Sequence, residues 1–305
     1  MTDQIVEDDA PSVLDLRAPA LVLDPFPGEG TAASTPGDLV FSDDGRYLAV
    51  TSQDCELVVF RTEDWTEHVR VSGSVLWGQD IQWVPGTHRL CKRLLEGEGR
   101  RDEAAPTRAY DVDTHAEVAI PPQPREVRSR TGRYRADTGY GRYQADGGYG
   151  GFTGYGAWVD VLSSAGGSRR LHLPRGKARV ARVSFTGDER RMFVGLGDAV
   201  HMVDLESGAV VASLAGVGAD AVVRPDGAYL VASAGRSPFT SEHERIDLWR
   251  ISDTALLMRC WSGGYYLPAF DWSPDGGMLA TSVVTGFQGY GGEIRVYQPG
   301  EPLAE

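Results

Sequence analysis

Apolar and polar residues alternate in short runs along most of the chain, and clusters of turn residues separate the runs. The clearest example lies between Val180 and Leu214, where the runs are rich in β-branched and aromatic residues. An apolar residue at every second position is typical of a half-buried strand, and Gly, Asp and Ser clusters are typical of turns. This segment therefore predicts a four-stranded antiparallel sheet, with strands at residues 183–186, 191–195, 200–204 and 210–214.

One such sheet cannot bury both of its faces, so we expect the pattern to repeat. Aligning the third strand of each repeat places seven residues in register at separations of 44 to 50 residues; these are Leu14, Phe60, Tyr110, Val159, Val203, Trp249 and Tyr297. Four strands in a repeat of this length are typical of a blade of a β-propeller. We predict an all-β protein with six complete blades, at about residues 38–71, 80–120, 126–173, 181–214, 220–259 and 268–298. Seven blades are the alternative.

A short turn joins the first two strands of several repeats, as in Phe41-Ser42-Asp43-Asp44-Gly45 and Trp272-Ser273-Pro274-Asp275-Gly276. With these turns and the apolar runs that follow them, the chain resembles the WD40-repeat family, in which a turn of the S-P-D-G type precedes the second strand. The family's Gly-His dipeptide is absent, and its Trp-Asp position holds other pairs such as Phe60-Arg61. The resemblance implies a divergent WD40-like β-propeller. Trp83 and Trp272 occupy the core position of their first strands, so we expect both to be structural.

The N-terminal region matches the end of a repeat rather than its beginning. Residues 12–23 follow the pattern of third and fourth strands, and no first or second strand precedes them. In WD40-type propellers an N-terminal strand completes the last blade, and the resemblance implies the same role here. We therefore expect a disordered acidic tail at residues 1–11 and a single β-propeller domain over residues 12–305.

The net charge of −13 opposes binding to nucleic acid or to an anionic membrane. No run of apolar residues is long enough to span a membrane, and the first residues lack the apolar region of a signal peptide. The three cysteines are scattered, which favours reduced thiols over a disulfide framework. Together these features predict a cytoplasmic protein without membrane contact.

Positive charge is concentrated around the third blade, despite the acidic total. Residues 125–182 contain 12 basic and 4 acidic side chains. Arg125 precedes this blade, and Arg175 and Lys177 follow it, so they are candidates for holding an anionic ligand such as a phosphate or an acidic partner segment. A single nucleic-acid strand is a further alternative that the overall acidity disfavours. Solvated arginines at strand edges are the structural alternative.

The connections between second and third strands are predicted to be long in four of the blades, whereas those between first and second strands are short. Loops longer than a turn requires are typical of recognition surfaces. Aromatic residues among glycines in such loops resemble binding hot spots. The candidates on the connections of blades 3, 5 and 6 are Trp261, Tyr265, Tyr266, Phe239, Phe287, Tyr290, Tyr149, Phe152 and Tyr155. The alternative is that Trp261 and Tyr266 fill gaps between blades.

Motifs of nucleophilic, zinc-dependent and nucleotide-dependent enzymes are absent, and the six histidines have no metal-ligand spacing. We therefore predict no cofactor and no metal. The leading hypothesis is a non-catalytic scaffold that binds a protein partner through the loop face formed by the second-to-third and fourth-to-first connections. The alternative is a small-molecule-binding or catalytic propeller with its pocket at the mouth of the central channel, because such pockets collect residues from several blades.

Overall fold

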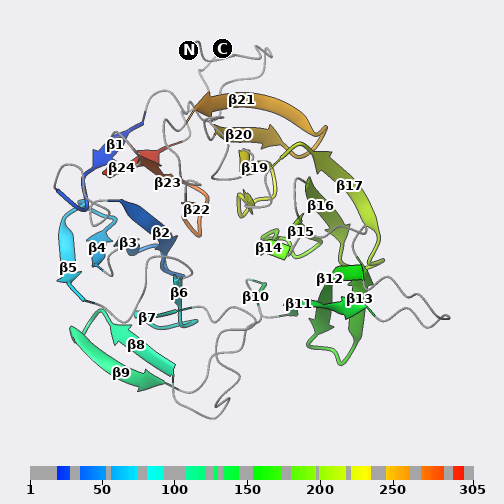
Figure 1. Cartoon of the computed structure of the whole chain (residues 1–305), viewed down its shortest axis with the longest axis horizontal. Helices are drawn as coiled ribbons and strands as arrows, with labels where there is room; N and C mark the ends of the chain where they lie inside the picture. The colour runs from blue at the N-terminus through cyan, green and yellow to red at the C-terminus, as the bar shows by residue number, and fades with distance from the viewer. Residues whose placement is uncertain are drawn as a thin grey trace. The chain divides into compact units, whose positions relative to one another are not determined.

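The computed structural model shows an all-β protein. It describes residues 19–27, 35–52, 56–73, 81–92, 107–120, 127–129, 133–143, 154–172, 180–196, 199–217, 221–234, 245–261, 269–284 and 291–298. These ranges contain 24 β-strands and no helix. The strands form six four-stranded antiparallel sheets, each a blade (Figure 1). The chain is a six-bladed β-propeller, which confirms the predicted fold class.

The blades are distributed over two compact units of the chain. Unit 1 comprises residues 1–124, 236–246 and 257–305, and unit 2 comprises residues 125–235 and 247–256. Blades 1, 2 and 6 lie in unit 1, and blades 3 and 4 lie in unit 2. The strands of blade 5 are divided between the two units.

In unit 1, blades 1 and 2 each use four consecutive strands. Those of blade 1 are β2 (Pro36–Phe41), β3 (Tyr47–Ser52), β4 (Leu57–Arg61) and β5 (Glu67–Val71). Those of blade 2 are β6 (Ile81–Trp83), β7 (Arg89–Lys92), β8 (Thr107–Asp111) and β9 (Ala116–Ile120). Both blades have the strand order of a meander, because each strand pairs with the next along the chain.

Blade 6 combines the two ends of the chain. Its strands are β22 (Phe270–Trp272), β23 (Leu279–Val284), β24 (Gly292–Tyr297) and β1 (Leu21–Leu23). β1 pairs antiparallel with β24, with Leu21 opposite Val296. An N-terminal strand therefore completes the last blade, as predicted. Residues 12–18, where the expected third-strand pattern falls, lie outside the described ranges.

Unit 2 holds two complete blades and most of a third. Blade 3 consists of β10 (Val127–Arg128), β11 (Tyr134–Tyr143), β12 (Gly154–Ser163) and β13 (Ser168–His172). Blade 4 consists of β14 (Val180–Phe185), β15 (Arg191–Leu196), β16 (Ala199–Asp204) and β17 (Val210–Ala215). Blade 5 consists of β18 (Ala221–Val223), β19 (Tyr229–Ala234), β20 (Arg245–Arg250) and β21 (Ala255–Trp261). The four strands predicted between residues 183 and 214 match those of blade 4.

The repeat predicted from the third strands is confirmed in all six blades. The aligned residues that fall within the described ranges all lie on third strands; they are Phe60, Tyr110, Val159, Val203, Trp249 and Tyr297. Five of them are buried, and Trp249 is half-buried. The alternation of apolar and polar residues therefore marks the faces along which adjacent blades pack.

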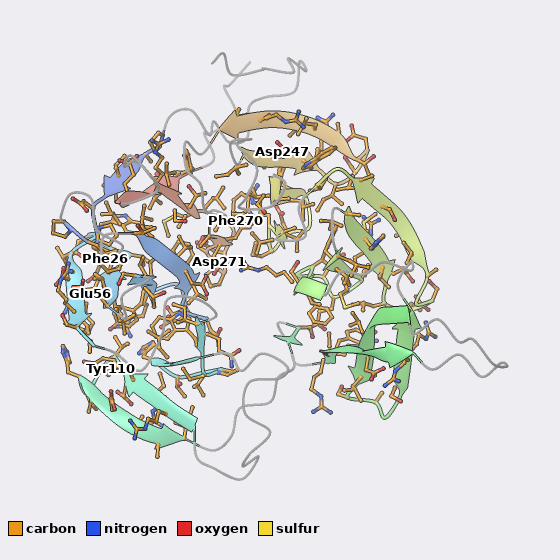
Figure 2. All side chains as sticks on the ribbon, viewed as in Figure 1. Phe26, Glu56, Tyr110, Asp247, Phe270 and Asp271 are labelled. Carbon is orange, nitrogen blue, oxygen red and sulfur yellow. The ribbon has the colours of Figure 1, made fainter. Side chains whose placement is uncertain are left out.

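Apolar clusters fill the space between neighbouring blades within each unit. In unit 1, one cluster joins blade 6 to blade 1 and contains Leu48, Ile294 and Phe26. Figure 2 labels Phe26. A second cluster joins blade 1 to blade 2 and includes Trp83. Trp83 and Trp272 are both buried, so the prediction that they are structural is confirmed.

Aspartates on the first strands form hydrogen bonds between the blades of unit 1. Asp271 on β22, labelled in Figure 2, accepts the backbone N–H of Phe41 at 3.0 Å. Asp38 on β2 accepts the N–H of Ile81 on β6, also at 3.0 Å. A buried backbone donor requires a partner, so each aspartate satisfies a group that the neighbouring sheet leaves unpaired.

The turns between first and second strands of blades 1 and 6 share one local design. In blade 1 the Ser42 hydroxyl donates to Asp44 at 2.7 Å, and in blade 6 the Ser273 hydroxyl donates to Asp275 at 2.6 Å. These local hydrogen bonds help to close each turn. Within the described ranges, no helix has the length and apolar character needed to cross a lipid bilayer.

Candidate functional site

Most of the predicted binding residues lie outside the described ranges, so they stay predictions. These are Phe239, Tyr265, Tyr266, Phe287, Tyr290, Tyr149, Phe152, Arg125, Arg175 and Lys177. For the other two, the structure describes the backbone alone. Trp261 is the last residue of β21, and Tyr155 lies on β12 opposite Arg142 of β11.

Tyr155 was predicted to lie on a connection of blade 3, and its position corrects that prediction. β11 continues to Tyr143 and β12 begins at Gly154, so Tyr155 belongs to a paired strand. The glycines suggested a loop because glycine weakens a strand. Pairing between β11 and β12 overrides this local preference. The connection between them is therefore limited to residues 144–153.

The two ends of the sheet differ in the length of their connections in four of the six blades. Turns between first and second strands are short and closed by hydrogen bonds, such as Gly45 N–H to Ser42 O at 2.8 Å and Gly276 N–H to Ser273 O at 2.8 Å. The connections between second and third strands are longer in four blades; they span residues 93–106, 144–153, 235–244 and 285–291. This agrees with the predicted difference in connection length.

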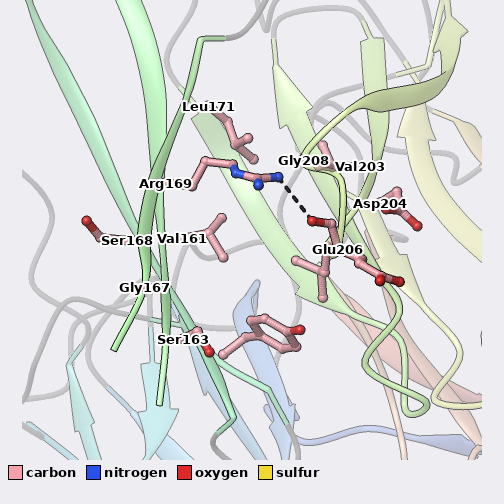
Figure 3. Close-up of a pocket in the computed structure, with 12 residues that line it drawn as sticks. Val161, Ser163, Gly167, Ser168, Arg169, Leu171, Val203, Asp204, Glu206 and Gly208 are labelled. Atoms are coloured by element: carbon pink, nitrogen blue, oxygen red, sulfur yellow. Dashed lines mark hydrogen bonds between the residues drawn. The ribbon is translucent and has the colours of Figure 1, made fainter. Parts of the chain in front are cut away.

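A pocket of about 280 Å³ lies in unit 2 between blades 3 and 4 (Figure 3). Its apolar wall consists of side chains from both blades, among them Val161 and Leu171 of blade 3 and Val203 and Leu205 of blade 4. These four residues belong to one buried cluster, which also packs against Tyr134. The wall is therefore part of the packed joint between the two blades and does not depend on a loop.

Polar groups form the opposite part of this pocket, at the turns between third and fourth strands. Ser163 and Gly167 belong to the turn of blade 3, and Glu206 and Gly208 belong to the turn of blade 4. Arg169 of β13 extends toward the second turn and donates from Nη1 to the Glu206 carbonyl at 3.3 Å (Figure 3). An apolar wall facing one guanidinium can hold a small ligand with an apolar body and a charged end.

The pocket differs in position from the one that the sequence suggested. In a propeller the first strand of each blade lines the central channel. No residue of β10 or β14, the first strands of blades 3 and 4, lines this pocket. It is therefore a pocket between blades. Sequence reasoning counted Arg169 among the basic residues around blade 3 but did not select it.

Unit 1 contains a second cluster of polar and aromatic side chains, between the turns of blades 1 and 2. His88 contacts a carboxylate on each side, with Nε2 at 2.9 Å from Asp44 and Nδ1 at 2.8 Å from Asp113. The ring of Tyr47 packs edge-on against His88 at 4.9 Å and stacks on His68 at 5.2 Å. The cluster thus joins the two blades through charge and ring contacts.

The electrostatics of His88 follow from this geometry. Burial opposes the charged imidazole, but hydrogen bonds to Asp44 and Asp113 and the charges of both carboxylates raise its pKa above the ordinary value. His68 behaves in the opposite way, because burial and the nearby Arg61 and His115 lower its pKa. The protonated form of His88 is thus favoured by the fold, and that of His68 is disfavoured.

Replacing His88 by glutamine is expected to remove stability that depends on pH. A histidine with a raised pKa stabilises the fold fully below its unfolded pKa, and this contribution is lost as the pH rises through the folded pKa. The difference in free energy of unfolding between the wild type and H88Q should therefore shrink, by on the order of 1 kcal/mol, between pH 6 and pH 9. Urea denaturation across this range measures it.

The control for this experiment removes the two carboxylates. In a D44N/D113N background, His88 faces amides in place of charges, so the effect of H88Q should lose its dependence on pH. An H88Q effect that is the same at every pH in the wild-type background would contradict the assignment of His88 as a charged bridge.

No group of three or more histidine, cysteine, aspartate or glutamate side chains within the described ranges is arranged to hold a metal ion. His88 with its two aspartates therefore has the geometry of an ion-pair bridge. Cys91 is buried, and its Sγ accepts from the side-chain amide of Gln82 at 3.7 Å. The expected absence of a metal or cofactor stays a prediction.

Comparison with protein-family models gives no match to the chain, and comparison with curated proteins gives none either. The β-propeller fold therefore stands on the strand topology and on the repeat in the sequence.

Proposed function

We propose that this protein is a WD40-like interaction scaffold that binds a protein partner through the connections at one end of its blades. The observation that carries the proposal is the difference between the two ends of the sheets. Short turns closed by hydrogen bonds join first and second strands, whereas the connections between second and third strands are long in four blades. Connections that are longer than a turn requires are typical of recognition surfaces.

The composition of these connections supports a protein as the partner. The connection at residues 235–244 contains Phe239, and the connection at residues 285–291 contains Phe287 and Tyr290. Trp261 ends β21, where the connection to blade 6 begins, and Tyr265 and Tyr266 follow on that connection. Aromatic side chains give large contact area at low cost in conformational entropy, and they dominate the binding energy of many interfaces. The blades supply the rigid support that such loops need to act as one surface.

Replacing Trp261, Tyr265 and Phe287 together by alanine is expected to weaken partner capture at least about thirtyfold, because each aromatic anchor contributes about 2 kcal/mol in a typical hot spot. The melting temperature should change by only a few degrees. Capture from native lysate with quantitative mass spectrometry, followed by thermal unfolding of the purified variants, measures both effects.

A matched control removes exposed apolar surface from the strands. Val22, Val210 and Val211 are the large apolar residues that are exposed within the described ranges. Their triple serine variant should capture the same partners as the wild type. The proposal fails if the aromatic variant unfolds, which would make these residues part of the core, or if it keeps its partners while the valine variant loses them.

A further inference from the structure

We propose that the pocket between blades 3 and 4 binds a small monocarboxylate with an apolar body, whose carboxylate pairs with Arg169. This site is independent of the scaffold function, because it lies at the turns between third and fourth strands and uses none of the predicted loop residues. Its walls come from packed strands and from two closed turns, so the site is formed before a ligand arrives.

Arg169 is the cationic end of the site. Its one hydrogen bond to a described residue is the long contact with the Glu206 carbonyl, and it forms no ion pair with a described carboxylate. The next residue, Arg170, forms an ion pair, because Asp160 accepts from its Nε at 2.7 Å and its Nη2 at 2.6 Å. Arg169 therefore keeps donors for an incoming anion, and the planar guanidinium fits a carboxylate in bidentate geometry.

Gly208 leaves room for this guanidinium against the turn of blade 4. A Cβ atom at Gly208 would overlap Nη1 and Cδ of Arg169, and the residue has a positive φ of 68°. Only glycine meets both requirements without strain. The absence of a side chain lets Arg169 lie against the turn of blade 4, at the polar edge of the pocket (Figure 3).

The apolar wall and the size of the pocket define the body of the ligand. Val161, Leu171 and Leu205 are buried, and Val203 is fully buried. A volume of about 280 Å³ lies just below the usual range of about 300 to 1,000 Å³ for small-molecule sites. The pocket therefore fits a compact apolar group such as a single aromatic ring or a short branched chain.

Local charge favours one negative charge on the ligand over two. Asp204 and Glu206 line the same pocket as Arg169. Asp204 accepts from both the backbone N–H and the hydroxyl of Ser207 at 2.7 Å, and these bonds lower its pKa, so it stays ionised at neutral pH. Its carboxylate points away from the cavity in Figure 3. A phosphate dianion would meet more repulsion here than a carboxylate.

Fluorine NMR with 4-fluorophenylacetate as the probe tests the site. Titration into the millimolar range should broaden or shift the probe signal with the wild type. The R169Q variant should bind about tenfold more weakly or worse, because it loses a charge-assisted pair. R170Q is the matched control, and its affinity should equal that of the wild type. Thermal unfolding of both variants checks that they are folded.

Two analogues separate charge from shape. The neutral amide 4-fluorophenylacetamide should bind at least about tenfold more weakly than the acid, and 4-fluorophenyl phosphate should also bind more weakly than the acid. The proposal is overturned if the acid does not bind the wild type, if the amide or the phosphate binds as well as the acid, or if R170Q reduces binding as much as R169Q does.

Discussion

Replacing Leu48 by alanine is expected to lower the free energy of unfolding by about 2 to 5 kcal/mol, the range for removing a large aliphatic side chain from a packed core. Leu48 lies on β3 and is fully buried. It belongs to the cluster that joins blade 1 to blade 6, together with Ile294 and Val296 of β24. The loss combines the transfer of apolar surface with the cavity that remains between two sheets. Denaturation in guanidinium chloride measures it as a shift of the midpoint.

The control is an exposed aliphatic side chain on an outer strand. Val211 lies on β17 and is 51% exposed. Its alanine variant should change the free energy of unfolding by no more than about 0.5 kcal/mol, because folding buries little of the apolar surface of this exposed side chain. Equal midpoints for L48A and V211A would contradict the assignment of Leu48 to an essential joint between blades.

The architecture could be predicted because the sequence of each blade shows the same alternation of apolar and polar residues independently of the others. A strand exposes alternate residues to opposite faces, so an aligned apolar position in the third strand marks the same face six times. Val159 and Val203 are both fully buried, although 44 residues separate them. The turns were also predictable in kind, since the hydroxyl and aspartate of Ser42-Asp43-Asp44 are local signals.

The contacts between blades were less predictable, because they depend on which turns lie side by side. His68, His88 and His115 have no spacing that suggests a cluster. The fold nevertheless brings them together around Tyr47, with ring centroids 5.2 Å apart for His68 and His115 and 4.9 Å apart for Tyr47 and His88. A signal existed in the repeat itself. His88 follows the first turn of blade 2 and His115 lies in the last turn of the same blade, so both belong to one end of a single sheet.

The pocket at Arg169 was not predictable for a related reason. Its walls come from two blades, and a sequence pattern reports which residues are buried without reporting where packing is incomplete. Arg169 also resembles its neighbours in the basic segment. Its distinction from Arg170 is that Asp160 pairs with Arg170, whereas Arg169 extends to the Glu206 carbonyl at the edge of the pocket. Such a difference appears only once the strands are paired.

Replacing Gly187 by alanine is expected to lower the free energy of unfolding by about 2 to 4 kcal/mol, through overpacking and the loss of a hydrogen bond. The Gly187 N–H donates to the Pro225 carbonyl at 2.6 Å, which joins the first turn of blade 4 to the first turn of blade 5. A Cβ at Gly187 would overlap that carbonyl oxygen and would lie 3.1 Å from its carbon. Backbone on both sides cannot rotate away as a side chain can, so the two turns must separate. The midpoint of urea denaturation measures the cost.

Gly167 provides a matched control in the turn between β12 and β13 of blade 3. A Cβ at Gly167 would have no atom within 4 Å. Alanine there should change the free energy of unfolding by less than about 0.5 kcal/mol, or raise it slightly by restricting the unfolded chain. If G187A and G167A denature at the same urea concentration, the turns of blades 4 and 5 do not hold one another. If G187A alone is destabilised, the contact between turns is a structural joint of unit 2 that acts beside the apolar cluster between the same blades, which contains Phe193 and Leu230.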